Sequence, residues 1–174
     1  MIRQQMRQRN RALTFEARLE ASERIFRQVE RLDRFATAQV VGLYCALPDE
    51  PPTAAVIDRW LALGKRVVVP RVEGDWMRFF DYNPATQVAG SFGIEEPGAE
   101  AVLCRPEEIE LMVVPGVAFT AGGDRMGRGR GYYDKYLAQN EFKAPTVGVC
   151  YYHQLVDALP VEPHDIRLDE VIAG

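Results

Sequence analysis

Four short runs of mostly apolar, strand-forming residues recur along the chain and constrain its fold more than any other feature. The runs occupy residues 40–44, 66–70, 111–115 and 146–149. The first is too short for a helix and too uniformly apolar for a half-exposed strand, which is typical of a buried parallel strand. Helical stretches alternate with the runs. The pattern predicts an α/β fold: a single three-layer α/β/α domain over residues 1–174, with a mostly parallel central sheet.

The longest expected helix is marked by a capping residue and by apolar spacing. Thr14 is a plausible N-cap, and residues at helical spacing follow it, namely Phe15, Leu19, Ser22, Phe26 and Val29. We expect helices over residues 2–12 and 15–32. The arginines that crowd the first 34 residues are expected to lie on a solvated helical face.

Further along the chain, capping signals and short apolar runs predict the remaining elements. Thr53 is expected to cap a helix over residues 54–61 that stops at Gly64. Another helix is expected over residues 132–139, and residues 76–82 are expected to form an exposed or edge strand.

Composition and charge exclude several classes of protein. Apolar residues make up 47 % of the chain and charged residues 26 %, which is ordinary for a globular protein. The three cysteines, odd in number and widely spaced, favour neither a disulfide framework nor a zinc site. The first residues do not resemble a secretory signal and no run is long and apolar enough for a membrane span, so a cytoplasmic location is expected. Because the net charge is −4, any anion site must be a local cluster.

The segment from Arg125 to Lys135 combines basic residues with glycines. Its basic members are Arg125, Arg128, Arg130 and Lys135, and its glycines are Gly127, Gly129 and Gly131. Glycines let backbone N–H groups approach phosphate oxygens, arginines supply forked donors, and a helix beginning near Gly131 would add its positive end. The spacing is neither a Walker A loop nor a dinucleotide fingerprint. The residues favour a phosphate site, with a flexible loop or an RNA contact as alternatives.

The stretches Val114–Phe119 and Gly123–Asp134 resemble the signature of the 5-formyltetrahydrofolate cyclo-ligase family, also called methenyltetrahydrofolate synthetases. Weaker similarity extends over nearly the whole chain. The resemblance implies an enzyme that uses ATP as co-substrate and Mg²⁺ to close 5-formyltetrahydrofolate to 5,10-methenyltetrahydrofolate, with release of ADP and phosphate. It implies that the γ-phosphoryl group moves to the formyl oxygen, N10 attacks, and phosphate leaves, without a covalent enzyme intermediate.

The resemblance also implies roles for individual residues. Its catalytic residues would be Arg125, Arg128 and Arg130. By this resemblance, the ATP site of the chain would comprise Arg3, Arg7, Arg125, Met126, Gly127, Arg128, Gly129, Arg130, Gly131, Tyr132 and Tyr133. Arg3 stands where the family ordinarily has lysine, and Met126 where leucine is usual. Its substrate site would comprise Cys45, Glu50, Phe92, Arg128 and Tyr132, and Mg²⁺ would bind Asp134 and Asp165.

Most of these residues also have an ordinary structural explanation. Arg3 and Arg7 fit a solvated face, Asp134 a helix N-terminus, and Asp165 a loop. Cys45 fits a buried structural thiol, and Phe92 a loop aromatic that packs on the domain. Glu50, by contrast, lies beyond the first strand, where ligands gather in open α/β sheets. The two histidines, His153 and His164, support neither a catalytic triad nor a histidine-rich metal site.

Two other functions remain open from the sequence. One is a nucleic-acid-binding module that uses the Gly–Arg segment and the basic first helix. The other is a phosphoryl-transfer enzyme of the same fold with another substrate. The expected partners are a small-molecule folate and ATP, with no nucleic acid and no membrane, for a chain that is a monomer or a weak dimer.

Overall fold

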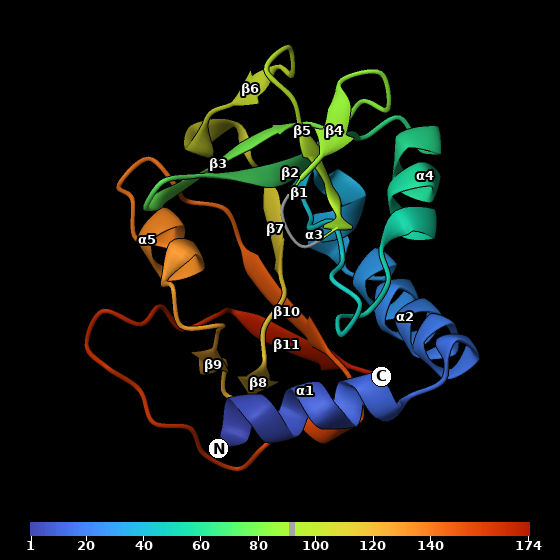
Figure 1. Cartoon of the computed structure of the whole chain (residues 1–174). Coiled ribbons are helices and arrows are strands. Elements are labelled where there is room, and N and C mark those ends of the chain that lie inside the picture. Colours follow the sequence, from blue (N-terminus) through green and yellow to red (C-terminus); the bar gives the residue numbers. More distant parts are fainter. Residues whose placement is uncertain (91–92) are drawn as a thin grey trace.

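The computed structural model describes residues 1–90 and 93–174, and its centre is a seven-stranded sheet (Figure 1). The strand order is β11-β10-β7-β1-β2-β3-β6. In chain order the strands are β1 (Val40–Gly42), β2 (Arg66–Glu73), β3 (Trp76–Asp81), β6 (Leu103–Cys104), β7 (Leu111–Val114), β10 (Thr146–Cys150) and β11 (Glu170–Ala173). Neighbours from β11 to β2 are parallel, whereas β3 is antiparallel to both β2 and β6. The predicted mostly parallel sheet is confirmed.

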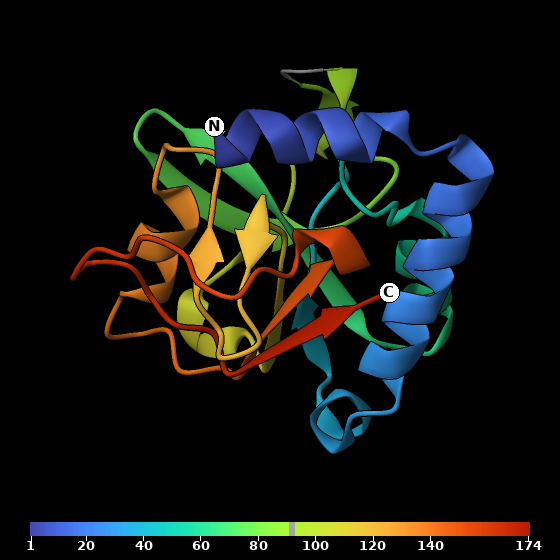
Figure 2. The same ribbon diagram turned by 90° about the horizontal axis from the view of Figure 1, so that it is seen from below.

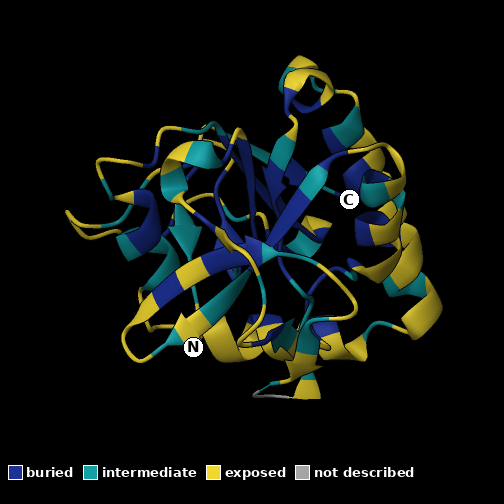
Figure 3. Cartoon of the chain, turned by 90° about the horizontal axis from the view of Figure 1, so that it is seen from above, coloured by how far each residue is buried: buried dark blue, intermediate teal, exposed yellow. Residues whose placement is uncertain are grey.

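Helices cover both faces of the sheet, which gives the predicted three layers (Figure 1). One face carries α2 (Phe15–Glu30), α3 (Asp33–Thr37) and α4 (Ala54–Ala62), whose buried residues Phe26 and Trp60 pack edge to face. The other face carries α5 (Tyr132–Leu137) and irregular chain, and its core includes Phe79 and Tyr136. The strands between the layers are the most buried part of the molecule (Figure 3).

The helix α1 (Ile2–Ala12) lies beside a small ribbon formed by β8 (Ala118–Phe119) and β9 (Arg125–Met126), as Figures 1 and 2 show. Buried Met6 packs there against Val117 and Ala118. The described residues also form the antiparallel pair β4 (Gln87–Ala89) and β5 (Glu95–Pro97), and short 3₁₀ turns at Pro106–Glu108 and Tyr152–Gln154. Within the described ranges, every helix is too short or too polar to cross a bilayer.

The structure confirms the Thr14 cap but corrects the buried face predicted for α2. Thr14 Oγ1 accepts a hydrogen bond from the backbone N–H of Ala17 at 3.0 Å. Phe15 and Leu19, placed in the apolar stripe, are 63 % and 42 % exposed, because the helix contacts the molecule along a face displaced from them. That face includes Arg18, which donates to the carbonyl of Pro48. The expected solvated arginine face is therefore wrong for this residue.

Thr53 is the N-cap residue of α4, as expected, and its carbonyl accepts a hydrogen bond from the Ile57 N–H at 2.9 Å. Its side chain, however, makes no capping hydrogen bond. Thr53 Oγ1 instead donates to the Tyr44 carbonyl at 2.7 Å and accepts from the Ala46 N–H at 3.2 Å. The hydroxyl thus closes the loop between β1 and α4, because its oxygen accepts from the Ala46 N–H instead of from an N–H of the helix.

Strand β3 was expected to be an exposed or edge strand, but it lies one position inside the edge of the sheet. The short strand β6 pairs with it at Phe79 and Phe80, which are both buried, while Trp76 at its start is 60 % exposed. Strand β11, helix α3 and the two small ribbons were not anticipated from the sequence. The expected helices over 15–32 and 132–139 end two residues early, at Glu30 and Leu137.

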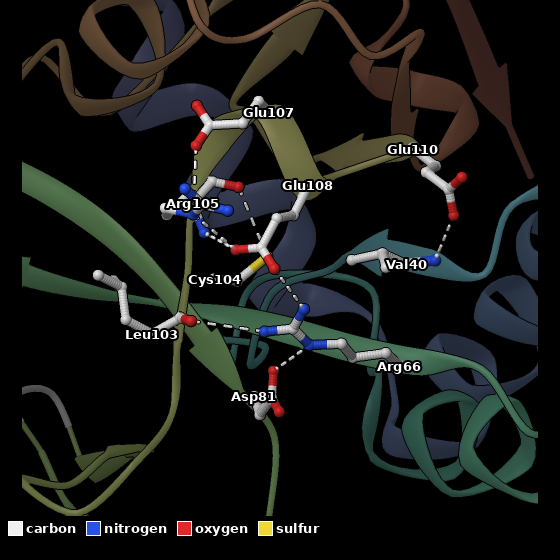
Figure 4. A network of polar contacts seen from close by, with 9 residues as sticks. All are labelled: Val40, Arg66, Asp81, Leu103, Cys104, Arg105, Glu107, Glu108 and Glu110. Atoms are coloured by element: carbon white, nitrogen blue, oxygen red, sulfur yellow. Dashed lines mark hydrogen bonds and ion pairs between the residues drawn. The ribbon is translucent and has the colours of Figure 1, made fainter.

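A network of polar contacts joins the elements near the amino ends of the parallel strands (Figure 4). Arg66, the first residue of β2, pairs with Asp81 at 2.5 Å and with Glu108 at 3.0 Å. Glu110 Oε1 accepts a hydrogen bond from the Val40 N–H at 3.0 Å. These contacts connect the starts of β1 and β2 to the chain before β7. The candidate site lies at the opposite edge of the sheet, at the carboxyl ends of the strands.

Candidate functional site

Several connections meet at the carboxyl ends of the parallel strands. They are residues 43–53 after β1, the turn at Gly74 and Asp75 after β2, and residues 115–131 after β7. Tyr132 Oη donates to the Gly74 carbonyl at 3.2 Å, which joins the second connection to the start of α5. In open α/β sheets this is the edge where ligands bind.

The Gly–Arg segment folds as a strand followed by a glycine-rich turn. Gly129 and Gly131 have φ angles of 102° and 72°, a left-handed conformation that other residues adopt at a cost. Gly131 is the N-cap of α5, so the helix begins where the sequence predicted. Arg3 Nε donates to the Gly127 carbonyl at 2.8 Å. The basic first helix is therefore joined directly to this turn.

The three arginines proposed as catalytic differ in their surroundings. Arg125 is partly buried; its Nε donates to the Pro115 carbonyl at 2.6 Å and its guanidinium lies 5.0 Å from the centre of the Tyr133 ring. Burial lowers the pKa of Arg125. Arg130 is exposed and makes no hydrogen bond to another described residue. Arg125 thus supports the segment from within, whereas Arg130 is open to a ligand.

Arg128 reaches from the Gly–Arg segment to two buried carboxylates. Its Nη2 lies 2.8 Å from Asp49 Oδ1 and 3.5 Å from Glu50 Oε2. The Asp49 and Glu50 side chains are only 5 % and 8 % exposed, so these contacts are poorly screened by water. Burial by itself lowers the pKa of Arg128, but the Glu50 and Asp49 charges more than offset it. The guanidinium therefore keeps its positive charge.

Glu50 is held by its own turn as well as by Arg128. Its Oε1 accepts a hydrogen bond from the Leu47 N–H at 2.8 Å. Burial raises the pKa of the Glu50 carboxyl, and the nearby Arg128 offsets only part of that rise. The adjacent Asp49 carbonyl accepts from Asn10 Nδ2 of α1 at 2.9 Å, and Asn10 also contacts His153. The loop that carries both carboxylates is thus anchored on several sides.

A cavity of about 340 Å³ lies beside Glu50. Cys45, another residue predicted for substrate binding, also lines it, and burial raises the pKa of the Cys45 thiol to about 12. The cavity wall is completed mainly by the start of α2, the start of α4 and the chain before β5, including Arg18, Thr53, Tyr82 and Glu95. Phe92, predicted for the same site, lies outside the described residues. A mostly apolar cavity with a few polar groups is typical of a small-molecule site.

The two predicted metal ligands lie on neighbouring segments. Asp134 Oδ1 accepts a hydrogen bond from the Ile166 N–H at 3.1 Å, which holds the chain next to Asp165 against α5. Asp165 Oδ2 accepts from the Glu162 N–H at 2.8 Å. In residues 1–90 and 93–174, His, Cys, Asp and Glu side chains nowhere gather in threes as a metal site. Two carboxylates fit Mg²⁺, which binds oxygen and fills its shell with water and phosphate.

The other predicted residues divide between packing and exposure. Met126 packs against the Met6 cluster, and Tyr133 Oη is buried without a partner among the described residues. Arg7 is exposed on α1, and its side chain has no hydrogen bond to another described residue. Arg7 therefore has no hydrogen bond to the Gly–Arg turn, in contrast to Arg3.

Sequence reasoning missed two residues of this region. Asp49 forms the shorter of the two contacts with Arg128, and Arg18 lines the cavity. Asp49 directly precedes Glu50, so its position after the first strand was an available signal. Arg18 carried no such signal, because its spacing on α2 fits a solvated face as well.

Comparison with known proteins gives consistent matches. The family model described as "5-formyltetrahydrofolate cyclo-ligase family" matches residues 1–174. A protein of that name from Escherichia coli K12 is 31 % identical, covering 96 % of this chain and 95 % of its own. One from Mus musculus is 29 % identical, over 98 % of this chain and 91 % of its own.

A solved structure agrees with these sequence matches. The NMR structure of Aquifex aeolicus 5,10-methenyltetrahydrofolate synthetase superposes with a TM-score of 0.87 at 32 % identity, covering 99 % of this chain and 87 % of the other. A synthetase from Mycoplasma pneumoniae gives a TM-score of 0.79 at 26 % identity, over 98 % of this chain and 95 % of the other. The fold and the sequence thus point to the same group of proteins.

Proposed function

The chain belongs to the 5-formyltetrahydrofolate cyclo-ligase family, and we propose that the cavity beside Glu50 and the Gly–Arg segment form the two halves of its active site. Its activity is that of a 5,10-methenyltetrahydrofolate synthetase, a ligase of folate metabolism. The proposal concerns how the residues of this chain perform that reaction with ATP and Mg²⁺.

The contact between Arg128 Nη2 and Glu50 Oε2, at 3.5 Å, carries this proposal. Arg128 belongs to the segment suited to phosphate, and Glu50 lines the cavity suited to the pterin. Groups bound to these two residues would lie close enough for direct transfer between them. Holding two reactants in this way supplies much of the rate gain in such enzymes.

In the cavity, Glu50 accepts hydrogen bonds from the N–H donors of the pterin. An ionised carboxylate has two acceptor oxygens and suits a pair of neighbouring donors. One of them, Oε1, is held by the Leu47 N–H, so the carboxylate keeps a fixed orientation. Cys45 contributes a neutral, un-ionised wall, because its raised pKa of about 12 keeps the thiol protonated at neutral pH.

On the Gly–Arg segment, the phosphates of ATP bind the turn around Gly129. Arg130 and Arg128 supply forked donors, while Arg125 and Arg3 hold the turn in place through the Pro115 and Gly127 carbonyls. Mg²⁺ would be held by Asp134 and Asp165, where it would screen the charges of the phosphate oxygens. Arg7, which is exposed on α1 one helical turn after Arg3, remains a proposed ATP contact.

We propose that the two halves of the site carry out the reaction that the family resemblance implies. The formyl oxygen of the folate attacks the γ-phosphorus of ATP, and ADP leaves. N10 then attacks the activated formyl carbon and gives up its proton to solvent, and the C–O bond breaks to release phosphate as the ring closes. Arg128 and Arg130 stabilise the negative charge of the transferred group, so the protein contributes positioning and electrostatic stabilisation rather than a nucleophile.

A direct assay tests the proposed function. The purified protein is mixed with 5-formyltetrahydrofolate, ATP and Mg²⁺, and the absorbance of the methenyl product is followed. Product should form only when all three are present. Product formation without ATP, or salt-dependent RNA binding in place of turnover, would contradict the proposal.

A further inference from the structure

Arg18 places a cation in the wall of the cavity beside Glu50. It projects from the first turns of α2, and its Nη1 donates to the Pro48 carbonyl, two residues before Glu50. Among the residues that line the cavity, Arg18 is the basic one, whereas Glu50 and Glu95 are acidic. Arg18 as a whole is half-buried, and its Nε is enclosed by the protein.

The donors of Arg18 are only partly satisfied. A guanidinium has five N–H donors, and the described part of the chain supplies one acceptor, the Pro48 carbonyl. Its Nε is buried and has no partner there. The terminal guanidinium nitrogens, in contrast, have N–H groups left over after the bond to Pro48, and these can donate to an acceptor of a ligand in the cavity.

We infer that Arg18 is a specificity-determining residue that donates a hydrogen bond to the O4 carbonyl of the pterin. This inference rests on the proposed function of the cavity. In a pterin the acceptor O4 lies next to the donor N3–H, with the 2-amino group beyond it. A carboxylate and a guanidinium on one wall complement that edge, Glu50 accepting from the donors and Arg18 donating to O4.

The position of Arg18 favours the pterin over the glutamate tail of the folate as its partner. Its buried Nε and its bond to Pro48 place the guanidinium at the loop that carries Glu50. The tail of the substrate carries charged carboxylates, which are bound at lower cost near solvent. Because Arg18 bonds to the loop that carries Glu50, we place it at the pterin and not at the glutamate tail.

Calorimetry with two ligands tests the inference. The ligands are 5-formyltetrahydrofolate and 5-formyl-6-methyltetrahydropterin, which lacks the aminobenzoyl-glutamate tail. Arg18→Gln should weaken the binding of both by about tenfold or more, and by the same factor, because it removes a charged donor to O4. ATP affinity should stay within about twofold. Arg24→Gln, on the exposed side of the same helix, is the matched control and should change nothing.

The outcomes separate this inference from the proposed function. If the wild-type protein binds neither ligand, the proposed function fails. If it binds both and Arg18→Gln binds both equally well, or loses only the full-length folate, the assignment to O4 is wrong. If Arg18→Gln does not fold, Arg18→Lys provides the test. The lysine ammonium lacks the planar, forked donors with which a guanidinium can bond to the Pro48 carbonyl and to O4 together. It should weaken the binding of both ligands at least about threefold, and unchanged binding would overturn the inference.

Discussion

Arg128 and Asp49 lie 79 positions apart in the chain, yet Arg128 Nη2 donates to Asp49 Oδ1 at 2.8 Å. The contact links the turn proposed for phosphate to the loop that bears Glu50. The second carboxylate oxygen of Asp49 is buried and has no partner among the described residues. Asp49 thus depends on Arg128 for compensation of its charge, and this dependence can be measured.

Arg128→Ala should lower turnover strongly and also reduce stability. The change leaves two buried carboxylates without their cation, which costs about 1–3 kcal/mol of folding free energy. Adding Asp49→Asn should restore part of the stability, because one buried charge is removed, but should not restore turnover. Steady-state assays and denaturant unfolding measure the two effects. Arg24→Ala serves as the control, and an equal loss of turnover there would show that the Gly–Arg segment has no special role.

Glu50→Gln should weaken 5-formyltetrahydrofolate binding while leaving ATP binding nearly intact. The carboxylate accepts from two donors of the pterin, whereas an amide accepts at one end and presents N–H groups at the other. The mismatch costs about 1–3 kcal/mol, or one to two decades in affinity. Calorimetry with each ligand is the measurement. An ATP affinity that falls as far as the folate affinity would place Glu50 outside the pterin site.

The same Glu50→Gln change should not destabilise the fold at neutral pH. The pKa of Glu50 is raised in the folded protein by burial, so the ionised side chain costs stability above that pKa. This cost diminishes as the pH falls through the folded pKa and is gone below the unfolded value. The stability advantage of the variant should therefore be largest near neutral pH and shrink in acid. Denaturant unfolding across that range checks it, and the opposite slope would refute it.

Asp134→Asn should keep the fold and raise the Mg²⁺ concentration needed for half-maximal turnover. The amide oxygen can still accept from the Ile166 N–H, so the packing of α5 is retained. A neutral oxygen is a weaker Mg²⁺ ligand than a carboxylate. A magnesium titration of turnover is compared with that of Asp58→Asn, whose carboxylate is exposed on α4. Identical titration curves for the two variants would remove Asp134 from the metal site.

Features that depend on neighbours in the sequence were determined by the sequence itself. The apolar runs after Gln39, Lys65, Glu110 and Pro145 predicted the parallel sheet. A short run that is apolar throughout is typical of a strand buried on both faces, as in a parallel sheet. Thr14 and Gly131 marked helix starts correctly, since a cap satisfies backbone groups only a few residues away. The Gly–Arg segment was recognised for the same reason: its glycines and arginines are adjacent.

Contacts between distant segments were decided only by the tertiary structure. Spacing on α2 could not distinguish Arg18, which lines the cavity, from a solvated arginine such as Arg24. Thr53 is the N-cap residue of α4, but in the folded chain its hydroxyl bonds to the Ala46 N–H and the Tyr44 carbonyl and not to the helix. Asp49 gains its partner only when the chain after β7 returns to the chain after β1. Burial and charge pairing depend on which segments come into contact. The packing of the whole chain determines those contacts, and no local sequence pattern does.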